Sequence, residues 1–142
     1  MSASQIQQRA DPTELGSLRA ARLEALFERS GDGIMVFSGD GELLLANPMA
    51  CTLFGLRDGT TRIRVEDLVP TDRRVAHAAH FAGFRDGHDD ARPMQRREIV
   101  HGLAADGREI ALEVTLARID VGGHRELVAY VRDASERARL IE

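Results

Sequence analysis

Residues 32–49 read DGIMVFSGDGELLLANPM and hold three structural signals in close succession. The apolar run IMVF is typical of a short strand, and the GDG that follows favours a tight hairpin into a second strand, ELLLA. Asn47 and Pro48 then have the residue types of a helix N-cap and first helical position, and Gly55 can end that short helix in a left-handed cap. The stretch therefore predicts two antiparallel strands followed directly by a helix.

A second helix start lies upstream, in the tetrapeptide DPTE at residues 11–14. Asp is a good N-cap, Pro favours the first helical position, and Glu at the third position completes a capping box. We expect a helix over residues 12–29. Its apolar side chains recur at helical spacing and leave an arginine-rich opposite face; they are Leu15, Leu18, Leu23, Leu26 and Phe27.

The middle of the chain carries another amphipathic pattern, which predicts a helix over residues 71–84. His77, His80 and Phe81 lie along one broad face of that helix. Residues 86–91, DGHDDA, are expected to form an exposed loop.

The last third of the chain is rich in strand signals, with strands expected at 97–103, 108–119 and 126–132. The strand at 108–119 alternates cleanly, so one of its faces is predicted to be dry and the other wet. The dry face would carry Ile110, Leu112, Val114 and Leu116, and the wet face Glu109, Glu113 and Thr115.

The order of these elements predicts an α+β fold, a five-stranded antiparallel sheet with helices gathered on one face. The main interior space would lie between the 71–84 helix and the 108–119 strand. The expected organisation is a flexible lead at 1–11, an N-terminal flanking helix at 12–30, a core at 31–132 and the start of a C-terminal linker helix at 133–142.

Composition excludes several classes of protein. The formal net charge of −4 and the absence of Trp argue against nucleic acid as a partner. No apolar stretch is long enough for a membrane span and no signal peptide is present, so we expect a cytoplasmic protein with no membrane partner. The sequence has no GxSxG, phosphate loop or carboxylate pair, which argues against an enzyme.

The residues at the predicted turns and helix starts resemble the motifs of the PAS family over about residues 20–137. The resemblance implies a sensory domain that binds a small ligand, a cofactor or a partner, and that signals through its flanking helices to a kinase, cyclase or transcription effector. The matching motifs are Asp32-Gly33-Ile34, Asp40-Gly41-Glu42, Asn47-Pro48-Met49-Ala50, Phe54-Gly55, Leu68-Val69-Pro70, Asp106-Gly107-Arg108-Glu109-Ile110 and the segment 131–137.

Within that family, the spacing from Val69-Pro70 to His77 resembles the haem-binding oxygen sensors of FixL type. The resemblance implies that His77 ligates the iron of haem b, since a neutral imidazole is the usual proximal ligand. The implied cofactor-binding residues are His77, Phe81, Leu112, Val114 and Leu116. The sequence departs from that group at Glu98, with Arg97 one residue away, where the group uses an arginine to hold bound oxygen.

Other ligands are less favoured by the sequence. His77 and His80 share a helical face but have no nearby carboxylate or thiol to complete a metal site. The light-sensing LOV branch of the family attaches flavin to a cysteine in an Asn-Cys-Arg context, whereas residues 62–67 contain no thiol and Cys51 belongs to the earlier short helix. A histidine at this position also occurs in PAS domains without haem, so a domain without any cofactor remains an alternative.

The terminal helices suggest the partners. The leucines Leu15, Leu18, Leu23 and Leu26 are expected either to cover the free face of the sheet or to form a homodimer contact with a second copy, and one interface can do both. The tetrapeptide DASE at residues 133–136 has the pattern of another capping box. The helix that it opens is expected to continue into a C-terminal effector domain not present in this chain.

Overall fold

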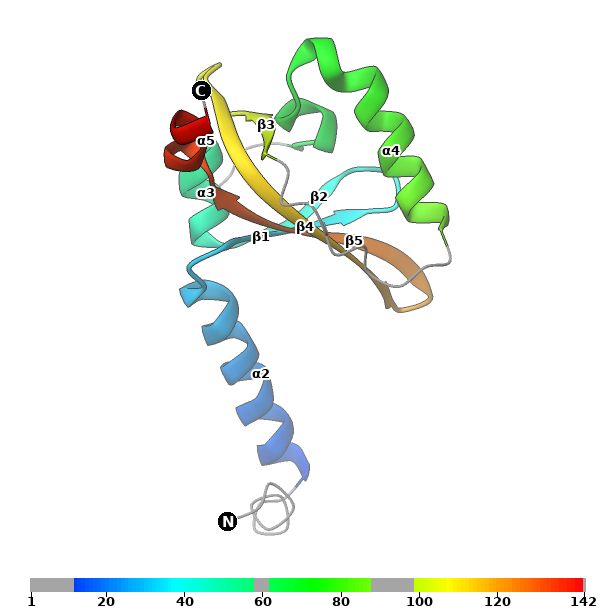
Figure 1. Ribbon diagram of the computed structural model, residues 1–142. Helices are drawn as coiled ribbons and strands as arrows, with labels where there is room; N and C mark the ends of the chain where they lie inside the picture. Colours follow the sequence, from blue (N-terminus) through cyan, green and yellow to red (C-terminus); the bar gives the residue numbers. More distant parts are fainter. Residues whose placement is uncertain (1–11, 58–61, 88–98, 142) are drawn as a thin grey trace.

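A five-stranded antiparallel sheet organises the protein, whose computed structural model describes residues 12–57, 62–87 and 99–141. The strands are ordered β2-β1-β5-β4-β3, which confirms the predicted α+β architecture (Figure 1). Their bounds are β1 Gly33–Ser38, β2 Leu43–Ala46, β3 Ile99–Leu103, β4 Glu109–Val121 and β5 His124–Asp133.

The β1–β2 hairpin forms where the sequence predicts it. Only Gly41 of its turn residues has a positive φ, 92°, which glycine adopts without steric cost. Ser38 and Glu42 close the turn, since the Ser38 N–H donates to the Glu42 carbonyl at 2.8 Å. The helix α3 (Pro48–Phe54) follows directly and ends at Gly55 with φ 69°, as predicted.

The helix predicted over residues 71–84 is divided in two. Thr71–Arg73 form the 3₁₀ turn η2, and the α-helix α4 runs from Arg74 to Asp86. The prediction of one continuous helix from residue 71 was therefore wrong at its start, because Arg73 has φ −111° and ψ 0° and acts as the N-cap of α4. Another 3₁₀ turn, η1 (Val65–Leu68), precedes it. Of the predicted loop at 86–91, residues 88–91 lie outside the described part.

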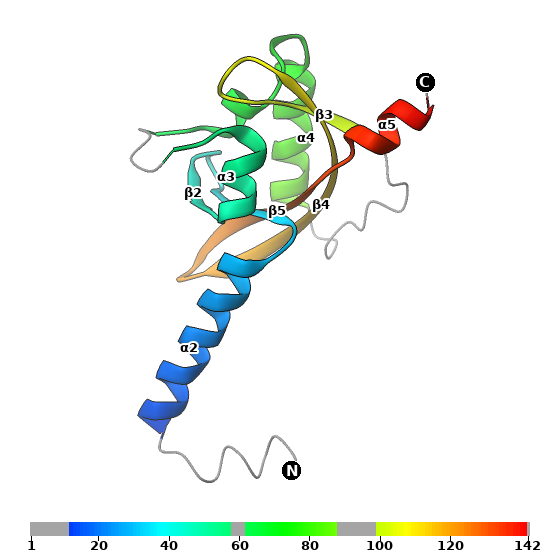
Figure 2. The same ribbon diagram turned by 90° about the vertical axis from the view of Figure 1, so that its left-hand side faces the viewer.

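The helices α3 and α4 and the turn η1 cover one face of the sheet, and the core lies between them and the sheet (Figure 2). β4 contributes Leu112, which is 2% exposed, and β5 contributes Val131 at 1%. The predicted dry face of the 108–119 strand is confirmed, since Ile110, Val114 and Leu116 pack against the same cluster. The buried cluster is Met35, Phe37, Ala50, Phe54, Leu68, Leu112, Ala129 and Val131.

The N-terminal helix α2 (Pro12–Arg29) has the predicted length but an unexpected position. It projects away from the sheet, and none of its residues is buried (Figures 1 and 2). Within one chain its leucines do not cover the free face of the sheet, because the helix leaves the domain at the edge of the core. The expected N-cap Asp11 and the lead at 1–11 lie outside the described residues.

The C-terminal helix α5 (Ser135–Ile141) begins where predicted. The Asp133 carboxylate accepts hydrogen bonds from the Ser135 N–H at 2.8 Å and from the Ser135 hydroxyl at 2.6 Å. Arg137 forms an ion pair at 2.6 Å with Glu113, which faces away from the core, so α5 lies on the opposite side of the sheet from α4. Within the described residues, no helix combines the length and apolar character needed to span a bilayer.

Candidate functional site

His77 projects from α4 at the rim of the core. Its side chain is half-buried, and its ring lies 6.3 Å from the Phe81 ring, centroid to centroid, with 36° between the planes. The two residues are four apart, so they lie one above the other on the same face of the helix. Phe81 in turn packs against the buried cluster.

The environment of His77 keeps its imidazole neutral. Burial lowers the pKa of His77 below its ordinary value of 6.5, and the charge of His80 lowers it further, while Glu66 on η1 acts in the opposite direction. A charged imidazolium loses hydration when it is buried, which explains the sign of the shift. At neutral pH the His77 side chain therefore carries an unprotonated ring nitrogen, the form that can ligate a metal.

The structure brings together the predicted ligand-binding residues. Phe81 on α4 and the β4 residues Leu112, Val114 and Leu116 all contact one buried cluster, and His77 adjoins it through Phe81. The residue types fit those that would hold haem, since an imidazole lies beside apolar side chains. Because these side chains already pack against the cluster, α4 and β4 would have to separate to admit a flat ligand.

Two other predicted site features have clear positions. Cys51 is half-buried on α3, and its Sγ lies 4.0 Å from the Ala46 carbonyl oxygen. His80 is exposed on α4. In the described ranges no group of three His, Cys, Asp or Glu side chains converges as a metal site would require. Arg97 and Glu98 lie outside the described residues.

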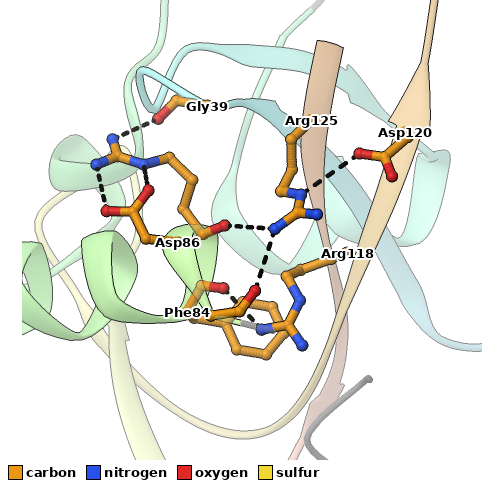
Figure 3. A network of polar contacts seen from close by, with 8 residues as sticks. Gly39, Phe84, Asp86, Arg118, Asp120 and Arg125 are labelled. Atoms are coloured by element: carbon orange, nitrogen blue, oxygen red, sulfur yellow. Dashed lines mark hydrogen bonds and ion pairs between the residues drawn. The ribbon is translucent and has the colours of Figure 1, made fainter. Parts of the chain in front are cut away.

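An arginine network joins the C-terminal end of α4 to two hairpins (Figure 3). Arg118 of β4 donates to the Phe84 carbonyl at 2.8 Å, and its guanidinium lies 4.5 Å from the centre of the Phe84 ring. Arg125 of β5 donates to the Arg85 and Gly87 carbonyls at 3.0 and 3.1 Å. Arg85 itself donates to the Gly39 carbonyl in the β1–β2 turn at 3.0 Å.

Asn47 joins α2 to the core. Its side chain is completely buried, at 0% exposure. The Oδ1 atom accepts from the Ile34 N–H at 2.8 Å and from the Ala50 N–H at 3.0 Å. The Nδ2 group donates to the Phe27 and Asp32 carbonyls, both at 3.0 Å. One amide side chain thus connects the last turn of α2, the start of β1 and the first turn of α3.

The sequence revealed only part of these polar contacts. Asn47 was predicted as the N-cap of α3, which the bond to Ala50 confirms, but its bonds to Phe27 and Asp32 were not foreseen. Arg118 and Arg125 carried no signal beyond their charge, because their partners are backbone carbonyls far away in the chain.

The arrangement is that of a small α+β regulatory domain, with a sheet covered on one face by short helices and with helices leading out at both ends. The family described as "PAS domain" matches residues 21–92. The chain belongs to the PAS domain family, whose members are generally sensory modules of signal-transduction proteins rather than catalysts.

Solved structures agree with that assignment. The PAS domain of the HTR-like protein from Haloarcula marismortui is 26% identical, with a TM-score of 0.68 over 85% of this chain and 96% of that one. A domain of the sensory box sensor histidine kinase/response regulator from Geobacter sulfurreducens is 23% identical, with a TM-score of 0.61 over 81% of this chain and 94% of that one. The LOV protein of Rhodobacter sphaeroides shares the fold at 15% identity, with a TM-score of 0.57 over 80% of this chain and 70% of that one. No curated protein sequence matches this chain closely enough to indicate an activity.

Proposed function

We propose that this PAS domain senses a small ligand or cofactor that binds between α4 and β4, and that it relays the bound state through α2 and α5. The observation that carries the proposal is the half-buried His77, whose lowered pKa keeps its imidazole neutral beside the apolar interior. An unprotonated imidazole can ligate a metal, and side chains with perturbed pKa values cluster at functional sites.

Haem b is the cofactor that we propose for this site, with flavin less favoured and a cofactor-free domain as the alternative. His77 would hold the iron, and Phe81, Leu112, Val114 and Leu116 would surround the macrocycle with apolar contacts. Haem would supply an open iron position for a diatomic gas. Leu112, Val114 and Leu116 would line the β4 side of the site with aliphatic groups, so they would exclude water and offer bound oxygen no charged partner.

The relay is supported by the way the two terminal helices leave the domain. β1 and β5 are neighbours, and Gly33 pairs with Val131 at the end from which α2 and α5 depart. Asp32 and Arg132 form an ion pair at 3.0 Å across this junction. Movement of the sheet would therefore reach both helices together. Such coupling requires that the ligand bind the two conformations with different affinity.

A homodimer is the second part of the proposal. On α2, Leu18, Leu23 and Leu26 are 46%, 56% and 69% exposed, and Leu15 is half-buried. Such a row of exposed leucines on a projecting helix is typical of a helix-helix contact with a second copy. We propose that α2 pairs with α2 of the second copy, and that α5 leads to a C-terminal effector domain.

The far face of the sheet also carries apolar side chains. Met35 and Phe37 point into the core, so Val36 between them points to the opposite face. There it pairs with Leu45 on one side and Val128 on the other, and Val128 pairs with Ala117. This apolar row crosses four strands; Val36 and Val128 in it are buried, at 8% and 5% exposure, and Leu45 is 56% exposed. If no cofactor binds, the domain would act as an interaction and dimerisation module through α2.

Absorbance spectroscopy tests the ligand proposal. Purified protein mixed with hemin should give a Soret band that the His77→Ala variant weakens or shifts, because the proximal imidazole is lost. His101→Ala is the matched control, since His101 is exposed on the edge strand β3 and should leave the spectrum unchanged. A hemin spectrum that is the same for wild type and His77→Ala would reject haem ligation by His77 and favour the cofactor-free module.

Sedimentation equilibrium tests the dimer. The double variant Leu23→Glu/Leu26→Glu should sediment as a monomer, because it places charges in the proposed helix-helix contact. Val75→Glu is the control, since Val75 is also exposed, at 87%, but lies on α4. A wild-type protein that remains monomeric at high concentration would contradict this part of the proposal.

A further inference from the structure

The C-terminal end of α4 lacks the cap that glycine usually gives a helix. Gly87 follows the helix with φ −67° and ψ 157°, an extended conformation instead of the left-handed one. The last carbonyls of a helix have no partner within it, and a left-handed glycine normally supplies one or two bonds to them. Within the part of the chain that the structure describes, the Gly87 N–H donates to the Phe84 carbonyl at 3.4 Å.

Two arginines from the opposite hairpin take over this role. Arg118 and Arg125 donate to the carbonyls of Phe84, Arg85 and Gly87, which are the groups at the negative end of the helix dipole. Asp120 orients Arg125 through an ion pair at 3.4 Å. Figure 3 shows both guanidinium groups directed from the β4–β5 hairpin toward the helix end.

Gly87 makes this approach sterically feasible. A Cβ atom at residue 87 would lie 2.8 Å from Nη1 of Arg118 and 3.2 Å from the Gly83 carbonyl oxygen. The absence of a side chain at Gly87 therefore leaves room for the guanidinium at the helix end. The contact of Arg118 with the helix end therefore depends on glycine at position 87.

The two ends of α4 are held differently. Near its N-terminal end the chain passes through Leu68, Val69 and Pro70, which are buried, and Arg74 donates to the Val69 carbonyl at 3.1 Å. No residue of α4 itself is buried. In its C-terminal half Phe81 packs against the buried cluster, and beyond Phe81 the carbonyls of Phe84, Arg85 and Gly87 accept hydrogen bonds from the hairpin arginines.

We propose that Arg118 and Arg125 form a releasable latch that holds the C-terminal end of α4 over the sheet, and that α4 swings about its N-terminal end when the latch opens. Opening exposes the interior between α4 and β4. This inference concerns access to the site of the proposed function, but the latch itself requires no ligand. It can therefore be tested on the ligand-free protein.

Amide hydrogen exchange of the ligand-free protein measures how strongly the two arginines hold the C-terminal end of α4. In the double variant Arg118→Met/Arg125→Met, the amides of residues 83–87 should exchange about tenfold faster, because charge-assisted hydrogen bonds to the helix end are lost. Arg132→Met is the matched control, since Arg132 also lies on β5 and forms an ion pair, but with Asp32 at the α2 junction. It should leave exchange in α4 unchanged.

Thiol labelling measures the opening. In a Cys51→Ser background, a Val114→Cys probe on the inner face of β4 should react with a thiol reagent about tenfold faster when the latch arginines are replaced. Faster exchange at 83–87 without faster labelling would mean that the helix end frays while the interior stays closed, which overturns the proposal. Unchanged exchange, or equal acceleration throughout the sheet, also overturns it.

A single variant keeps the proposal testable if the double variant does not fold. Arg125→Met removes an exposed side chain near the tip of the hairpin and should give a smaller acceleration confined to the same residues. Failure of haem to bind would leave these results intact, so the latch and the ligand proposal can fail separately.

Discussion

Replacing Asn47 should lower the free energy of unfolding more than replacing any exposed polar side chain. The Asn47→Ala variant loses the four side-chain hydrogen bonds to Ile34, Ala50, Phe27 and Asp32. A net value of about 1 kcal/mol for each bond gives a loss of about 4 kcal/mol, because partners within the protein are left unsatisfied. Domains are stable by only about 5 to 15 kcal/mol, so this is a large share of the total.

Urea denaturation followed by circular dichroism measures this loss. With an m value of about 2 kcal/mol/M, the midpoint should fall by about 2 M while m stays unchanged. Ser38→Ala is the control, since Ser38 accepts one exposed hydrogen bond from the Glu42 N–H at 3.1 Å and should cost less than about 1 kcal/mol. A loss for Asn47→Ala no larger than that of Ser38→Ala would refute the reasoning.

The Asn47→Asp variant separates the two halves of the hydrogen-bond set. Aspartate keeps the acceptor for Ile34 and Ala50 but turns the donor to Phe27 and Asp32 into a carboxylate oxygen that faces two carbonyls. Burial then favours protonation, so this variant should gain stability as the pH falls, because the protonated acid can donate again. Exchange in the last turn of α2 should rise in the variant at neutral pH and fall on acidification.

Three further outcomes follow from the structure. Gly102→Ala should lower the free energy of unfolding by about 1 to 3 kcal/mol in urea titrations, since the new Cβ would lie 2.9 Å from both Leu112 Cδ1 and Phe54 Cε1. The control Gly107→Ala should cost about 1 kcal/mol, because its Cβ meets no atom within 4 Å but its φ of 89° is strained for alanine. The His77 contribution to stability should be lost as the pH falls below 6.5, because the unfolded chain binds a proton that the folded state, with the lowered pKa of His77, does not. The His77→Gln variant should flatten this part of the pH profile of the unfolding midpoint. Arg132→Ala should change the unfolding midpoint little, since the Arg132–Asp32 pair is exposed at 64% and 37% and such pairs contribute about 0 to 1 kcal/mol.

Most of the fold could be predicted from local chemistry. Pro12 is the first described residue of α2, Asn47 and Pro48 set the start of α3, the left-handed Gly55 ended α3, and the alternation of β4 indicated its buried face. These signals act within a few residues, so a single sequence contains them. The alternation was also enough to bring Leu112, Val114 and Leu116 to the same interior as Phe81.

The features that the sequence missed depend on partners far apart in the chain. The helix predicted over residues 71–84 is divided at Arg73, and α2 projects away from the sheet. Both features depend on how the core packs, which local helix propensity does not express. Arg118 and Phe84 are 34 residues apart, and their contact involves a backbone carbonyl that every residue possesses.

By itself the sequence determined the order of helices and strands and the apolar face of β4, because residue type and spacing express capping and periodicity directly, while the PAS type and the proposed role of His77 came from family resemblance. Only the tertiary structure decided that Asn47 connects α2 to the core and that arginines of the β4–β5 hairpin hold the end of α4. The physical reason is that a backbone carbonyl has no sequence signature. Which donor reaches it is settled only when the sheet brings distant segments together.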